Sequence, residues 1–159
     1  MQISNSEELH KLLSKAYQIE TEYETLAEWE GYVSVQNPKY RDLLFELISD
    51  SEKHAFMVKD LLSMVLLPQD YHAPVLQPAS FNFSRKSEFD VMLELERYEQ
   101  LTLDLYSAIR DAVLKSNVET YVRSGDLDAF VAILDKLIVD EEHHRDAVHS
   151  FIGGVKMIR

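Results

Sequence analysis

Apolar residues recur three and four positions apart in four long stretches of the chain, and no stretch alternates for long with period two. This spacing is typical of helices that bury one face, so the pattern predicts an all-α protein. The expected helices cover about residues 4–35, 37–65, 87–115 and 126–152. Four amphipathic helices of this length bury their apolar faces together as a four-helix bundle.

Local signals mark where these helices begin and end. Ser4, with Glu7 three residues later, has the spacing of a capping box at the first helix. Asn37 before Pro38 is typical of an N-cap followed by proline at the first helical position. The pair Gly153-Gly154 is expected to end the last helix.

The connections predict how the four helices are arranged. The first two helices meet at a tight turn around Asn37, so they should be antiparallel, and residues 121–126 form a short connection between the last two. The stretch of roughly 20 residues from Pro68 to Lys86 holds three of the chain's four prolines and is unusually long for a compact domain. Such a segment can run the height of a bundle. We therefore expect two antiparallel helix pairs joined by one long crossover between the second and third helices.

Composition narrows the class of protein further. The 159 residues are 46% hydrophobic and 28% charged, which fits one globular domain over residues 1–159. The chain has no cysteine, which excludes disulfides, thiolate metal sites and thiol nucleophiles. The net charge of −12 repels phosphate backbones, so nucleic acid is not expected as a partner. No secretory signal or membrane span is visible, so we expect a cytoplasmic protein without a membrane partner.

Several polar residues lie on the apolar faces of the helices near mid-length. By helical angle, Glu141 is at the centre of its face, and the others are within roughly 60° of theirs. Burying a charge without compensation costs several kcal/mol, so these positions need an explanation. Carboxylate and imidazole ligands suit iron, manganese or zinc. The inward residues are Glu20, Ser51, His54, Glu99, Glu141 and His144.

The pair Glu141 and His144 is the clearest candidate for a metal site. Residues three apart share a helix face, so both side chains can reach the same metal. Leu137 and Val148 on either side place the pair in the core. The alternative is a buried Glu–His pair that is only hydrogen-bonded.

The first helix carries a run of acids from which one ligand has to be chosen. Glu20 lies roughly 50° from the centre of the apolar face and Glu22 roughly 105°, which favours Glu20 and leaves Glu22 as the alternative. The run as a whole, which includes Glu24, Glu28 and Glu30, is expected to form mostly a solvated helix face.

These residues give the chain a resemblance to the ferritin-like superfamily, and most closely to the rubrerythrin-type diiron domain. Members carry Glu on helices 1 and 3, often with Tyr seven residues later, and Glu-x-x-His on helices 2 and 4. Here Glu99 is followed by Tyr106, Glu141 by His144, and residues 37–55 look like the second-helix segment. The resemblance implies a ferritin-like bundle that holds two iron ions, with manganese or zinc as alternatives. The implied ligands are Glu20, His54, Glu99, Glu141 and His144, and Tyr106 would hydrogen-bond a ligand carboxylate.

The second helix departs from the family pattern at Ser51, which stands where the family has Glu. A serine hydroxyl is short and neutral, so the second metal position should be weak, with water or the flanking Asp50 filling the gap. On this hypothesis Ser51→Glu would strengthen the second position.

Three functions are compatible with this resemblance. The first is an oxidoreductase that acts on peroxide or dioxygen. It would need an external electron donor, because the chain lacks the family's rubredoxin part. The second is ferritin-type iron oxidation or storage in a larger assembly. The third is a non-enzymatic metal-binding or interaction protein whose site has degenerated. A homodimer or a larger homo-oligomer is expected in the first two cases.

Overall fold

The computed structural model describes residues 2–73, 75, 82–83, 85–116 and 118–156, without the side chains of 23, 24 and 154–156. Among the described residues the regular elements are all helices and no strand occurs, which confirms the all-α class. Pro74 and Pro78 of the expected crossover lie outside the described residues. The elements are α1 (Ser6–Gln18), the π-helix η1 (Ile19–Glu24), α2 (Thr25–Ser34), α3 (Pro38–Met64), α4 (Glu88–Lys115), the 3-10 turn η2 (Val118–Thr120) and α5 (Leu127–Lys156).

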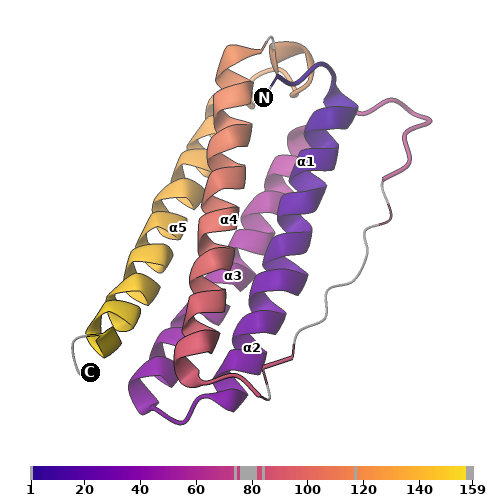
Figure 1. Cartoon of the computed structure of the whole chain (residues 1–159). Coiled ribbons are helices and arrows are strands. Elements are labelled where there is room, and N and C mark those ends of the chain that lie inside the picture. The colour runs from indigo at the N-terminus through magenta and orange to yellow at the C-terminus, as the bar shows by residue number, and fades with distance from the viewer. Residues whose placement is uncertain (1, 74, 76–81, 84, 117, 157–159) are drawn as a thin grey trace.

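Helices α3 and α4 run in the same direction (Figure 1). Where both begin, the N–H of Asn37 donates to Oε1 of Glu88 at 2.9 Å. Where both end, the N–H of Leu66 donates to the carbonyl of Tyr121 at 2.7 Å. The chain therefore leaves α3 and enters α4 at opposite ends of the bundle (Figure 1). The segment α1–η1–α2 is antiparallel to α3, and α4 packs along α5 in the opposite direction (Figure 1).

The buried apolar residues form two clusters separated by a polar layer. One cluster includes Leu13, Leu61 and Phe130, and the other includes Leu44 and Ile152. In every long helical segment the chain passes from one cluster to the other through buried polar residues. The two clusters supply the burial energy of the fold and keep water from the layer between them.

Two predicted helix boundaries are wrong. Asn5, not Ser4, caps α1, because its side-chain oxygen accepts from the N–H of Glu8 at 2.8 Å. Helix α5 continues through Gly153 to Lys156 instead of ending before it. A glycine within a helix costs only about 1 kcal/mol, which does not stop a helix whose flanking residues are packed. The cap Asn37 is where the sequence placed it, and α4 begins directly after its cap Ser87, at the expected start of the third helix.

The first helix is interrupted by the π-helix η1, which the periodicity did not predict. The hydroxyl of Thr25 donates to the carbonyl of Glu20 at 2.6 Å, and the N–H of Thr25 donates to the same carbonyl. A π turn holds one residue more than an α turn, so it shifts the register of everything after it. Ala27 and Glu28 are consequently buried, whereas Leu26 is 44% exposed.

Gly31 brings α2 close to its neighbours and provides a test of this packing. A Cβ at this position would lie 3.2 Å from Cγ1 of Val91 and 3.6 Å from Cδ2 of Leu44. We expect Gly31→Leu to lower the free energy of unfolding by roughly 2 kcal/mol, because the core has no room for the side chain. Gly153→Leu is the matched control, since a Cβ at that position would have open space within 4 Å. Equal losses in urea unfolding of the two variants would contradict the packing.

Candidate metal centre

The polar layer of the bundle contains four carboxylates and two imidazoles, all buried. They come from η1, α2, α3, α4 and α5, so the complete bundle is needed to bring them together. Of the five residues predicted as ligands, all are in this layer. The six side chains are Glu20, Glu28, His54, Glu99, Glu141 and His144.

His54 lies between the carboxylates of two other helices. Its Nδ1 is 2.7 Å from Oε1 of Glu141 and 3.7 Å from Oε2 of Glu20. Its Nε2 faces the other way, 3.4 Å from Oδ2 of Asp140. One ring nitrogen thus faces the polar layer, and the other faces an aspartate at its edge.

His144, on α5, likewise has one ring nitrogen facing the carboxylates and the other facing an aspartate. Its Nδ1 is 3.5 Å from Oε2 of Glu99 and 4.0 Å from Oε2 of Glu141. Its Nε2 is 3.3 Å from Oδ2 of Asp50. The rings of His54 and His144 stack with their centroids 5.3 Å apart and 28° between their planes.

Each aspartate therefore orients the histidine of the other helix. An Nε2–H donated to the aspartate leaves the Nδ1 lone pair directed inward, which is the tautomer a metal ligand needs. Burial lowers the pKa of His54 to about 4, and repulsion from His144 contributes to the decrease. The imidazole of His54 is consequently neutral at pH 7, as metal binding requires.

Asp50 was a less favoured candidate ligand, and the structure places it at the edge of the layer. It is half-buried, and its Oδ1 is 2.5 Å from Nζ of Lys53. Burial raises the pKa of Asp50, but the hydrogen bonds to Lys53 and His144 outweigh that effect and lower it. Asp140, which the sequence reasoning missed, is likewise paired with Lys136. Both aspartates act on histidines and do not face the carboxylates.

The structure also separates the two candidates on the first helix. Glu20 is fully buried, and the hydroxyl of Tyr106 donates to its Oε1. Glu22 is half-buried and accepts from Nε2 of Gln18 at 3.0 Å. Glu20 is thus the residue in contact with His54, and Tyr106 contacts the carboxylate as expected.

Glu28 is the residue for which the sequence prediction was wrong. It was expected on a solvated face, yet it is fully buried beside Ser51. The hydroxyl of Ser51 lies 3.4 Å from Oε2 and 3.5 Å from Oε1 of Glu28. The π-helix that rotates Glu28 inward leaves no signal in the apolar spacing. Glu30 is exposed, as expected, and the side chain of Glu24 lies outside the described residues.

The charges of the layer fit a bound cation. Among the described residues, no Lys or Arg is buried with the four carboxylates. Oε2 of Glu99 is buried without a hydrogen-bond partner, and Nδ1 of His54 faces the carboxylate of Glu141 at 2.7 Å without the geometry of a hydrogen bond. One donor atom each from His54, Glu141 and His144 lies within 4.8 Å of the others, so a single ion can contact all three. Burying several carboxylates together is costly, and divalent cations would offset that cost.

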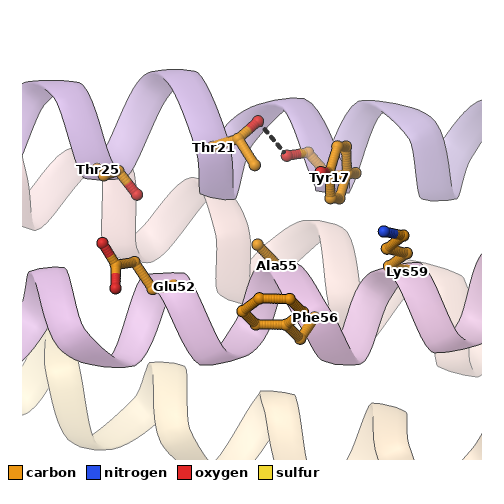
Figure 2. A pocket seen from close by; sticks show the side chains of 7 residues that line it. All are labelled: Tyr17, Thr21, Thr25, Glu52, Ala55, Phe56 and Lys59. Atoms are coloured by element: carbon orange, nitrogen blue, oxygen red, sulfur yellow. Dashed lines mark hydrogen bonds between the residues drawn. The ribbon is translucent and has the colours of Figure 1, made fainter.

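A surface hollow of about 340 Å³ lies outside this layer, between the first helix and α3 (Figure 2). None of the six side chains of the polar layer lines it. Thr21 and Ala55 on its walls follow Glu20 and His54 directly in the chain. The lining residues are Tyr17, Thr21, Thr25, Glu52, Ala55, Phe56 and Lys59.

Comparison of the chain with protein-family models, with curated proteins and with solved structures finds no match. In the described part of the chain, no helix combines the length and apolar character needed to cross a membrane.

Proposed function

We propose that the protein is a metal-binding oxidoreductase of the ferritin-like, rubrerythrin type, with two iron ions held in the polar layer and peroxide or dioxygen as its substrate. The observation that carries this proposal is the set of four buried carboxylates with two imidazoles whose Nδ1 atoms face them. The parallel course of α3 and α4, with a long connection between them, also favours this class over a simple up-down bundle.

Five residues of the polar layer would act as metal ligands. Glu20, His54, Glu99, Glu141 and His144 would hold the metal ions. Bound iron would supply the electron transfer that reduction of peroxide or dioxygen requires. Manganese and zinc suit the same ligands, but zinc has no redox chemistry, so it would leave a non-catalytic site.

The surrounding residues would keep the centre in place. Asp50 and Asp140 hold the two imidazoles with Nδ1 inward, and Tyr106 holds one oxygen of Glu20. The apolar clusters on both sides exclude water, which strengthens every electrostatic contact within the layer. Because the chain has no cysteine, the reducing electrons would come from an external donor.

Metal analysis tests the proposal most directly. The protein is purified at neutral pH without chelator, loaded anaerobically with ferrous iron, and analysed for metal per chain and for peroxide consumption with an added reductant. We expect two ions per chain and turnover of peroxide that chelation abolishes. Binding of no metal would contradict the proposal and favour an interaction protein.

The net charge of −12 favours ferritin-type iron oxidation as the second candidate, because an acidic protein concentrates cations at its surface. Assembly size separates the two functions. A large hollow oligomer that takes up many iron ions per chain would favour storage, whereas a dimer with two ions per chain would favour the oxidoreductase.

A further inference from the structure

Glu28 is a buried carboxylate that none of the roles above uses. It lies eight residues after Glu20, and in a continuous α-helix that spacing would turn the two side chains roughly 80° apart. The π-helix η1 between them absorbs one extra residue. Glu28 therefore takes the place that position i+7 has in an uninterrupted helix, about two turns from Glu20 and on nearly the same face.

Across the layer, Glu28 meets the one ligand position of α3 that has no carboxylate. Ser51 is three residues before His54, so both face the same side of α3. The short serine side chain leaves space beside α3, and the carboxylate of Glu28 fills it, with both oxygens within 3.5 Å of the hydroxyl.

The other polar groups of the layer favour a metal ligand over a purely structural Ser–Glu contact. A serine hydroxyl is neutral, and hydrogen bonds of 3.4 to 3.5 Å are at the long limit of the interaction. Such a contact is enough to orient a buried carboxylate. The same layer holds Oε2 of Glu99, which is buried without a hydrogen-bond partner, and Nδ1 of His54, which faces the carboxylate of Glu141 at 2.7 Å. A cation in the layer would contact these atoms, and Glu28, on the same side as Ser51 and His54, would be a further ligand for it.

We propose that Glu28 is a metal ligand that supplies, from α2, the carboxylate that Ser51 does not supply from α3. This inference rests on the metal centre proposed above and adds a sixth protein ligand to it. The second metal position is then complete in the wild type and is not the weak site that Ser51 alone predicted. Ser51 positions Glu28 through its hydroxyl and does not itself bind metal.

The test is a ferrous or cobaltous ion titration of three variants with the stoichiometry per chain as readout. Glu28→Gln keeps the size and the contact with Ser51 but removes the charge, so we expect two bound ions in the wild type and one in the variant. The double variant Glu28→Gln with Ser51→Glu returns a carboxylate to the same space from the other helix and should regain the second ion. Glu30→Gln, an exposed neighbour, is the control and should keep both ions.

A further variant separates ligation from a structural role. Ser51→Ala removes the hydroxyl and leaves Glu28, so it should keep two ions, with the second bound up to about 10-fold more weakly. If the Ser–Glu contact were only structural, Ser51→Ala and Glu28→Gln would lower the melting temperature alike and leave the stoichiometry unchanged.

The outcomes also separate this inference from the proposed function. A wild type that binds no metal overturns both. A wild type and a Glu28→Gln variant that bind two ions with equal affinity overturn the role of Glu28 and leave the centre itself intact. Loss of one ion in Glu28→Gln and its return in the double variant support the assignment.

Discussion

Glu141→Ala is expected to lower the affinity of the protein for its metal by about 100-fold or more. Loss of residues that merely orient ligands costs roughly 10- to 100-fold in other metal sites, and Glu141 would contact the metal itself. Its Oε1 is 2.7 Å from Nδ1 of His54, and its Oε2 is 4.0 Å from Nδ1 of His144, so it connects the two imidazoles. His144→Ala should have an effect of the same order, because the variant removes the donor atom that faces Glu99.

The residues between Glu141 and His144 provide matched control variants. Glu142 and His143 are exposed on the outer face of α5, so Glu142→Ala and His143→Ala change the same residue types without touching the layer. Metal content after dialysis against buffer, measured on all four variants, is the readout. Full metal content in Glu141→Ala or His144→Ala would show that the ligand assignment on α5 is wrong.

Glu99→Gln is expected to change the stability of the protein in opposite directions with and without metal. In the metal-free protein, the substitution removes one of four buried negative charges, and we expect the free energy of unfolding to rise by roughly 2 kcal/mol. In the metal-loaded protein, it removes a ligand. Since a ligand present at about 100 times its Kd stabilises by about 2.7 kcal/mol, weaker binding should reverse the sign of the effect.

Urea unfolding in excess chelator and in excess metal measures both effects. Glu46→Gln on the exposed face of α3 is the control, and it should change stability by less than about 0.5 kcal/mol in both conditions. A loss of stability on Glu99→Gln in chelator would mean that the carboxylate is compensated within the protein. In that case the argument from uncompensated charge would fail.

The local sequence was sufficient to predict the positions of most of the helices. The spacing of apolar residues located four helical segments, α3 begins after Asn37 where cap chemistry predicted, and α4 begins after Ser87 at the start that the apolar spacing predicted. Helical angles also placed Glu99 and Glu141 inward, because both lie on uninterrupted α-helices for which an angle of about 100° per residue holds.

The sequence contained a further signal that could have been used. Residues 50–54 and 140–144 both place an aspartate four residues before a histidine. In the structure, each aspartate contacts the histidine of the other helix, because α3 and α5 are antiparallel and bring the two motifs face to face. The repeat was visible in the chain, but the exchange of partners depends on how the helices pack.

Only the tertiary structure decided the orientation of Glu28. The angle of a residue along a helix is predictable only while every turn has the same number of residues, and η1 breaks that condition between Glu20 and Glu28. A π turn leaves the apolar spacing almost unchanged, and its stability depends on the packing of the whole bundle around it. The sequence by itself therefore determined the helices, most of their ends and the inward residues of α3, α4 and α5. Packing decided which residues face inward beyond the π turn. A shift in register by one residue costs little locally, so the contacts of the side chains across the core determine which register forms.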